Sequence, residues 1–422
     1  MPGDRTTRSR ADRVVARVGE LAQLSEDDGA LTRRYGTRPL AEALDRVEGW
    51  LREAGLSTSR DGIGNLVGRL EGERPGLPAL AIGSHLDTVR DAGAWDGQLG
   101  VLLGLDQPER LAQAAAAGAT GLPFALEIAV FADEEGLRFP TAYLGSQAWA
   151  GLWDDAQLAL ADTDGIPLAD AVRAMGGDAR TIAQAARAPG EVLAWCEAHI
   201  EQGTRLERAG VPLGVVTAIQ GQTRCTATFR GQAGHAGTTP MDSRRDALLA
   251  AAEWALAVES EALAVAELVA TVGRLTVSPG AANVIPGEVS ATLDARHPDD
   301  ATRREAVAAL SAFAEDIAAM RGVELEWRQD TDNASVVMAP RLQELLGRAV
   351  QETTGAAAPR LASGAGHDAA PLSRITDVSM LFIRCRAGIS HNPLEHVEPE
   401  DVAATIAALD RFVQLLAEAE RG

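Results

Sequence analysis

Histidine and carboxylate side chains gather in short, glycine-flanked clusters along this 422-residue chain. Three of its seven histidines, His85, His199 and His391, lie in such clusters, and Asp96 lies in a loop shortly after His85. Imidazole and carboxylate ligands without thiolates suit zinc, manganese, cobalt or nickel. We therefore predict a centre for two metal ions, in which Asp96 bridges the ions and His199 and His391 complete the ligand set.

Two adjacent carboxylates, Glu134 and Glu135, follow an apolar run. Adjacent carboxylates repel one another unless a cation or a shared proton offsets their charge. Taken alone, the pair fits a solvated acidic turn equally well. Beside the other clusters, we expect one carboxylate to bind metal and the other to take a proton from the attacking water. Asp87, two residues after His85, suits an outer role in which it accepts the imidazole proton and fixes the tautomer.

Two of the clusters follow predicted strands. Residues 77–84 and 124–131 are short apolar runs that read as buried strands, and each ends at a polar cluster. Open α/β sheets bind ligands outside the carboxyl ends of their strands, so these two clusters should share one crevice. Residues 10–56 show helical spacing, with Leu40, Leu44 and Val47 on one face, which predicts two opening helices.

The pattern of apolar and polar residues changes at about residue 214. Alternating stretches at 214–219, 223–229, 268–272 and 289–296 predict strands, and residues 244–265 and 301–320 predict helices. This order is typical of a small α+β insert with an antiparallel sheet. From about residue 339 the pattern is again typical of alternating strands and helices. A chain of 422 residues is also long enough for two domains.

The composition of the chain excludes some classes of binding partner and indicates the cellular compartment. The formal net charge of -21 argues against nucleic acid or an anionic membrane surface as the main partner. No apolar run approaches the roughly 18 residues that a membrane span requires. Cys196, Cys225 and Cys385 are an odd number of cysteines without metal-ligand spacing, which argues against a disulfide framework. We therefore expect a cytoplasmic protein.

The clusters together resemble the M20 metallopeptidase superfamily, in particular the branch that contains allantoate amidohydrolases, N-carbamoyl-L-amino acid hydrolases and beta-ureidopropionases. The resemblance runs from about residue 20 to the C-terminus. Its most specific motifs are Gly83 to Val101, Glu134-Glu-Gly-Leu-Arg-Phe139, His199-Ile-Glu-Gln-Gly203, Gly231-Gln-Ala-Gly-His-Ala-Gly-Thr-Thr-Pro-Met241, Asn283-Val-Ile-Pro-Gly287, Ser363-Gly-Ala-Gly-His-Asp-Ala369 and Gly388-Ile-Ser-His-Asn-Pro393.

The resemblance implies a fold with two parts. Residues 1–212 and 328–422 would form an α/β catalytic domain of the zinc-peptidase type with a central mixed sheet. Residues 213–327 would form an inserted α+β, ferredoxin-like lid and dimerisation domain. The protein would act as a homodimer in which each subunit holds two divalent ions. Manganese is usual in the allantoate enzymes and zinc elsewhere in the superfamily, with cobalt and nickel as further candidates.

The resemblance also assigns roles around the ions. One ion would be bound by His85, Asp96 and His199, and the other by Asp96, Glu135 and His391. Glu134 would be the general base, and Asp87 would orient His85.

Further residues resemble those that contact substrate in the family. His235 would polarise the scissile carbonyl, often across the dimer, while Asn283 and Arg296 would hold a substrate carboxylate, a role that suits the planar guanidinium. Gln202 and His367 would line the pocket. The structural alternatives are a surface arginine at a strand end for Arg296 and a loop histidine capped by Asp368 for His367. We expect only structural roles for His297 and His396.

Three positions depart from the family pattern. Gly234 and Gly280 stand where asparagine is common, and Arg384-Cys-Arg386 replaces a smaller, more neutral stretch before Gly388. The two arginines are candidates for altering the preference for anionic substrates. Cys385 is either a thiol activated by its arginine neighbours or a buried structural cysteine, and we favour the second interpretation.

The resemblance implies hydrolysis of a carbamoyl C–N bond in a small anionic ureido substrate. The segments Ser25 to Arg33 and Thr88 to Gly93 resemble the allantoate amidohydrolases, so we predict allantoate as the substrate. The alternatives are an N-carbamoyl-L-amino acid hydrolase or beta-ureidopropionase, which would share these site residues, and an M20 dinuclear peptidase, against which the segment Ser363 to Ala369 argues. A binding protein that has lost catalysis is a further alternative, but the intact Glu134 argues against it.

Overall fold

The computed structural model describes residues 2–116 and 121–422. The chain divides into two compact units. The first comprises Met1–Thr217, Met338–Leu361 and Gly366–Gly422, and the second comprises Ala218–Val337 and Ala362–Ala365. The expected domain boundary at residue 327 falls within strand β12 (Glu324–Asn333), which belongs to the sheet of the second unit, and the second unit therefore extends to Val337.

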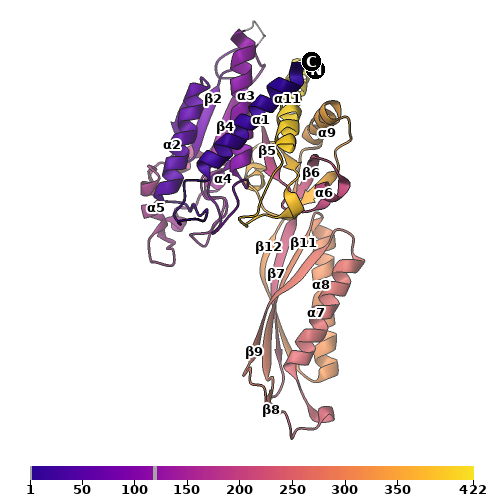
Figure 1. Cartoon of the computed structure of the whole chain (residues 1–422). Coiled ribbons are helices and arrows are strands. Elements are labelled where there is room, and N and C mark those ends of the chain that lie inside the picture. Colours follow the sequence, from indigo (N-terminus) through magenta and orange to yellow (C-terminus); the bar gives the residue numbers. More distant parts are fainter. Residues whose placement is uncertain (1, 117–120) are drawn as a thin grey trace. The chain divides into compact units, whose positions relative to one another are not determined.

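A mixed sheet forms the centre of the first unit (Figure 1). Its four middle strands, in the order β4, β3, β5 and β15, run parallel to one another. Antiparallel strands flank this group, with β2 and β1 beyond β4, and β6 beyond β15. The strands are β1 (Ser57–Arg60), β2 (Leu66–Leu70), β3 (Ala79–His85), β4 (Ala125–Phe131), β5 (Val192–Ile200), β6 (Leu213–Ile219), β14 (Arg360–Ser363), which pairs with β6, and β15 (Val378–Ile383).

The parallel strands consist almost entirely of apolar residues, as expected where both faces of a sheet are buried. Every residue of β3, β4 and β15 is buried, as expected for parallel strands that lie between helical layers. The predicted strands at 77–84 and 124–131 are thereby confirmed. The helices of this unit are α1 (Pro2–Leu21), α2 (Arg38–Glu53), α3 (Gln98–Ala116), α4 (Leu144–Trp149), α5 (Leu168–Ala174), α6 (Arg205–Ala209), α9 (Pro340–Thr354), α10 (Ala369–Leu372) and α11 (Pro399–Arg421).

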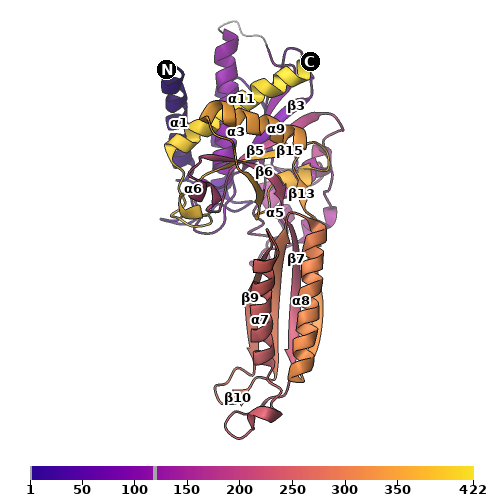
Figure 2. The same cartoon turned by 90° about the vertical axis from the view of Figure 1, so that its right-hand side faces the viewer.

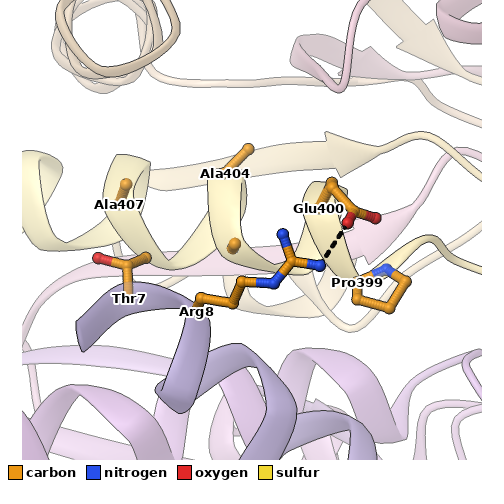
Figure 3. Close-up of a pocket in the computed structure, with 7 residues that line it drawn as sticks. Thr7, Arg8, Pro399, Glu400, Ala404 and Ala407 are labelled. Atoms are coloured by element: carbon orange, nitrogen blue, oxygen red, sulfur yellow. Dashed lines mark hydrogen bonds and ion pairs between the residues drawn. The ribbon is translucent and has the colours of Figure 1, made fainter. Parts of the chain in front are cut away.

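The two opening helices predicted from the apolar spacing are α1 and α2. In α2 the residues Leu40, Leu44, Val47 and Leu51 are buried, so the predicted face is the one that packs. Helix α1 lies beside the C-terminal helix α11 (Figure 1). Arg8 of α1 pairs with Glu400 of α11 at 2.8 Å, over a shallow pocket of about 400 Å³ (Figure 3). None of the described residues that line this pocket is a candidate site residue.

A four-stranded antiparallel sheet in the order β12, β7, β11, β9 forms the second unit. Residues alternate between buried and partly exposed along β11, and helices α7 and α8 cover the buried face (Figure 2). The predicted antiparallel α+β insert is therefore present. Its elements are β7 (Gly221–Arg230), β8 (Gly234–His235), α7 (Ala247–Ala264), β9 (Val269–Ser278), β10 (Val284–Ile285), β11 (Glu288–His297), α8 (Asp300–Arg321), β12 and β13 (Val336–Val337). In the described part of the chain, no helix is long and apolar enough to cross a membrane.

Candidate metal centre

The predicted metal ligands lie at one edge of the central sheet. His85 is the last residue of β3, His199 is the penultimate residue of β5, and Glu135 follows the end of β4. These strands are parallel neighbours, so their carboxyl ends meet at the same edge. His391 lies in the loop that follows β15, the next parallel strand. The topology thus brings together residues from four segments that are far apart in the sequence.

Asp96 lies between two groups of ligands. Its Oδ1 is 3.0 Å from His199 Nε2 and 3.5 Å from His85 Nε2. Its Oδ2 is 3.5 Å from His391 Nε2, and Glu135 Oε1 is 3.4 Å from the same nitrogen. One carboxylate therefore faces both groups, each with a different oxygen, which is the arrangement that a bridging ligand requires.

The imidazole rings are held by hydrogen bonds on their other nitrogens. His199 Nδ1 lies 2.9 Å from the carbonyl oxygen of Ile200, and His85 Nδ1 lies 3.0 Å from the carbonyl oxygen of Asp87. A ring that donates from Nδ1 presents the lone pair of Nε2 to a metal ion. Both rings therefore have the tautomer that a ligand needs, with Nε2 directed at Asp96.

Asp87 acts through different atoms from those expected. Its backbone carbonyl is the closer partner of His85, while its carboxylate Oδ1 is 3.7 Å from His85 Nδ1. The carboxylate accepts hydrogen bonds from the backbone N–H groups of Glu134 at 3.2 Å and Glu135 at 3.1 Å. Asp87 thus links the loop of His85 to the loop that carries both carboxylates.

The electrostatics of the carboxylate pair favour a bound cation. Burial raises the pKa of Glu134 well above its usual range, an effect that the charge of His85 opposes and that of Glu135 reinforces. Burial, and after it repulsion from Asp96, raises the pKa of Glu135 to about 8. Carboxylates this close together and this buried are costly to ionise without a compensating charge. A divalent cation would supply that charge.

The donor set fits two divalent cations. His85, Asp96 and His199 form one group in which the ligand atoms lie within 4.8 Å of one another, and Asp96, Glu135 and His391 form a second. Both described groups lack thiolates, which matches the prediction of divalent metal held by nitrogen and oxygen ligands. Glu197, His199 and His367 form a third such group, which uses His199 again.

Gln202 and His367, the predicted pocket residues of the first unit, both lie beside the ligands. Gln202 Nε2 donates to Asp96 Oδ2 at 2.7 Å and to Ser390 Oγ at 3.1 Å, so Gln202 helps to orient the carboxylate that the two ligand groups share. The ring of His367 is buried and meets the His199 ring edge-on at a centroid distance of 4.5 Å. Burial lowers the pKa of His367 well below its usual value, so its ring is neutral.

The other three predicted substrate residues belong to the second unit. His235 is exposed and pairs with Val284 between β8 and β10, which places it next to Asn283, whose carbonyl accepts from Ala236 N at 3.0 Å. His235 Nδ1 accepts a hydrogen bond from Gly237 N at 3.0 Å. The proton of the neutral ring therefore lies on Nε2, the atom that could donate to a carbonyl oxygen.

Arg296 lies at the opposite end of the same unit. It is the penultimate residue of β11, whereas Asn283 precedes the start of that strand, and at about 3.3 Å per residue the strand separates them by roughly 25 Å. The Arg296 guanidinium donates to both carboxylate oxygens of Asp294 and, at 2.6 Å, to Gly364 O. The structure does not bring Asn283 and Arg296 together within one chain.

Several residues around the ligands escaped prediction. Ser390 Oγ donates to Asp96 Oδ2 at 2.8 Å, and Ser84 Oγ donates to the buried Glu197 at 2.9 Å. Ser146 Oγ donates to the buried Asp368 at 2.6 Å. Position alone could have suggested some of them, because Ser390 precedes His391 and Glu197 lies two residues before His199 on the same strand. Glu395 gave no such signal, because its partners are backbone amides of Trp95 and Asp96.

The two segments that suggested allantoate are joined to each other. Arg33 N donates to Thr88 Oγ1 at 3.0 Å, and Thr88 N donates back to Arg33 O at the same distance. The Arg33 guanidinium is fully buried and donates to Leu86 O at 2.6 Å and Gln98 Oε1 at 2.6 Å. The two segments thus form one support beneath the turn that follows His85.

The departure from the family pattern at Arg384-Cys-Arg386 has a structural explanation. Arg384 makes two hydrogen bonds of 2.8 Å to Asp401, and Arg386 pairs with Glu398 at 2.6 Å, so both guanidinium groups are bonded to carboxylates at the start of α11. Burial raises the pKa of Cys385 to about 11, which supports the structural interpretation of that cysteine. His297 has a backbone carbonyl partner on each ring nitrogen, which also fits the expected structural role.

Comparisons with known proteins identify the family of the chain. The model of peptidase family M20/M25/M40 matches residues 81–415. The chain is 39% identical to an allantoate deiminase of Arabidopsis thaliana, over 96% of this chain and 82% of the relative. It is also 39% identical to an N-carbamoyl-L-amino acid amidohydrolase of Geobacillus stearothermophilus, over 97% and 100%. A crystal structure of a hydantoinase/carbamoylase family amidase from Burkholderia multivorans superposes with a TM-score of 0.89 at 34% identity, covering 96% of this chain and 97% of that one. The resemblance drawn from the motifs is confirmed, and the chain belongs to peptidase family M20/M25/M40.

Proposed function

We propose that this protein is a metal-dependent amidohydrolase that cleaves the carbamoyl C–N bond of allantoate. One ureido group and one water molecule would give an amine, carbon dioxide and ammonia. The observation that carries the proposal is the position of Asp96 between two ligand groups, with the buried Glu134 alongside. Glu134 Oε2 lies 3.9 Å from His85 Nε2, so a carboxylate that belongs to neither of the two groups sharing Asp96 lies beside one of their ligands.

The residues of the chain divide the work of hydrolysis. Two divalent ions, with manganese as our choice and zinc, cobalt or nickel as alternatives, would polarise the ureido carbonyl and lower the pKa of a water molecule. Glu134 accepts the proton of that water and passes it to the leaving nitrogen, a role that suits a buried carboxylate outside the two groups that share Asp96. Asp87 keeps the Glu134 backbone in place, and the neutral His367 supplies a polar group in the pocket.

Two relatives with the same identity to this chain have names that point to different substrates. One is named an allantoate deiminase and the other an N-carbamoyl-L-amino acid amidohydrolase, so both substrate classes remain candidates. The joined segments around Arg33 and Thr88 favour allantoate, because these are the parts of the sequence that resemble the allantoate enzymes, and they support the His85 turn. The three cysteines are free and buried, which supports a reducing cytoplasm as the setting.

The substrate is tested by measuring ammonia release by the manganese-loaded protein. We expect kcat/KM to be higher for allantoate than for any member of a panel of N-carbamoyl-L-amino acids and N-carbamoyl-beta-alanine. Dipeptides are included to test for the peptidase alternative. Faster turnover of a carbamoyl amino acid would replace allantoate as the substrate, and peptide cleavage without ammonia release would overturn the proposed reaction.

We further propose that the second unit is a ferredoxin-like lid and dimerisation domain and that the protein works as a homodimer. Leu249, Leu256 and Leu263 recur every seven residues on α7 and are exposed, Leu256 by 68% and Leu263 by 83%. Strand β9, at the edge of the sheet, exposes Val269 and Leu275. A row of exposed leucines on a helix and an open sheet edge are both typical of an interface, and a second copy of the chain would cover both.

The separation of Asn283 from Arg296 supports a shared active site. Asn283, which precedes β11, and Arg296, near the end of that strand, are roughly 25 Å apart and cannot bind one small carboxylate together within one chain. We propose that Arg296 acts in one subunit, while His235 and Asn283, which lie together, act on the substrate of the partner. His235 would then donate its Nε2–H to the scissile carbonyl oxygen.

Subunit mixing tests this arrangement. His235→Ala and Glu134→Gln proteins should each be nearly inactive. If His235 acts on the partner's substrate, a mixed dimer holds one site with an intact Glu134 and an intact partner histidine. Random mixing of equal amounts should then restore up to about a quarter of the wild-type rate, since half of the dimers are mixed and each has one complete site. If exchange of subunits is verified and no activity returns, action across the dimer is ruled out.

A further inference from the structure

Glu395 binds the backbone of the loop that carries Asp96. Its side chain is only 5% exposed, and Oε1 accepts hydrogen bonds from Trp95 N at 2.6 Å and Asp96 N at 2.9 Å. Glu395 itself lies in the turn that follows His391, since its N–H donates to Asn392 O at 3.0 Å. One buried carboxylate thus joins the loop of the shared ligand to the loop of the last ligand.

Packing leaves this side chain little freedom. A Cβ atom placed on Gly93 would lie 2.2 Å from the Cβ of Glu395 and 2.6 Å from its carboxyl carbon. Gly93 does not have a positive φ, so the glycine is required for space and not for its backbone conformation. The close approach means that the side chain of Glu395 has no room to move toward Gly93.

The contacts of Glu395 differ in kind from those of the other residues around Asp96. Gln202 and Ser390 donate to Oδ2 of the Asp96 side chain and so fix its rotamer. Glu395 instead fixes the backbone from which that side chain extends. Because the two oxygens of Asp96 face different ligand groups, a shift of its backbone changes both groups together.

We propose that Glu395 is a positioning residue that fixes the Asp96 backbone relative to His391 and thereby sets the affinity of the protein for both metal ions. This inference rests on the proposed dinuclear centre. Outer partners of metal ligands commonly contribute 10- to 100-fold to metal affinity, which is the range we expect for Glu395.

The test is a titration of the metal-free protein with Mn²⁺, in which binding is measured by equilibrium dialysis and elemental analysis. Glu395→Ala should weaken binding of both ions by at least about tenfold. Glu395→Gln keeps an oxygen acceptor for the two N–H groups, so it should bind both ions more tightly than Glu395→Ala. Gly93→Ala should displace the Glu395 carboxylate by steric contact and so should also lower the affinity for both ions. This variant replaces Glu395→Ala in the test if Glu395→Ala does not fold.

Glu398→Gln is the matched control, because Glu398 lies in the same segment, is partly exposed and pairs with Arg386. It should bind both ions as the wild type does. If Glu395→Ala and Gly93→Ala lower the melting temperature of the metal-free protein but leave both affinities unchanged, Glu395 is only structural and the inference is wrong. A wild-type protein that binds no Mn²⁺ would instead overturn the proposed manganese centre, so the two failures are distinct.

Discussion

Glu134→Gln is expected to lower kcat by about 10²- to 10⁴-fold while the protein keeps both metal ions. The amide has nearly the shape of the carboxylate but cannot accept a proton from water. Glu134 belongs to neither of the two ligand groups that share Asp96, so its charge is not required to hold an ion. The measurement is the rate of ammonia release together with the metal content of the purified variant.

The control is Glu53→Gln, because Glu53 is exposed near the end of α2 and far along the chain from every ligand. It should leave both the rate and the metal content unchanged. If Glu134→Gln kept the wild-type rate, another group would have to be the base. If instead it lost an ion along with its activity, Glu134 would be a ligand, and the division of labour between Glu134 and Glu135 would have to be reversed.

Asp96→Ala is expected to abolish the dinuclear centre. Asp96 is the one residue common to the two ligand groups described above, and its removal leaves two ligands in each. We expect each affinity for Mn²⁺ to fall by more than the roughly 100-fold upper range for an outer partner, and ammonia release to fall below detection. Dialysis and elemental analysis of the purified variant measure the loss.

Asp96→Asn separates bridging from simple binding. An amide has one oxygen acceptor, whereas the carboxylate presents one oxygen to His199 and the other to His391. Asp96→Asn should therefore retain at most one ion with useful affinity. Asp45→Ala is the control, because the Asp45 side chain is 70% exposed on α2 and pairs only with Arg60 among the described ion pairs. Two ions bound to Asp96→Asn with wild-type affinity would show that Asp96 does not bridge.

The parts of the fold that could be predicted from the sequence are those in which local pattern and burial agree. The apolar runs before His85 and Glu134 are strands buried on both faces. The predicted ligands and the predicted base lie where these apolar runs end. The alternating residues of β11 likewise revealed a sheet with one covered face. In each case, side-chain type reports directly on which atoms are removed from water.

Other features depend on contacts that side-chain patterns do not encode. Asp87 was expected to bind His85 through its carboxylate, but the backbone carbonyl takes that place and the carboxylate binds amides of the next loop. Glu395 also binds backbone amides, which every residue except proline provides. The sequence of the Asp96 loop therefore does not indicate that Glu395 is its partner. The distance between Asn283 and Arg296 follows from the direction of β11, which motif spacing does not contain.

The wide spacing of the ligands along the chain also governs when the centre can form. The first ligand is His85 and the last is His391, and the whole second unit, Ala218–Val337, lies between them in the sequence. During synthesis, a chain that has not yet released His391 from the ribosome lacks one ligand of the second group. Because ions that bind only the native state add their binding energy to folding, the second of the two proposed ions would stabilise only a chain that already contains His391. Under this proposal the first ligand group is complete once His199 has been made, whereas the second must wait for His391.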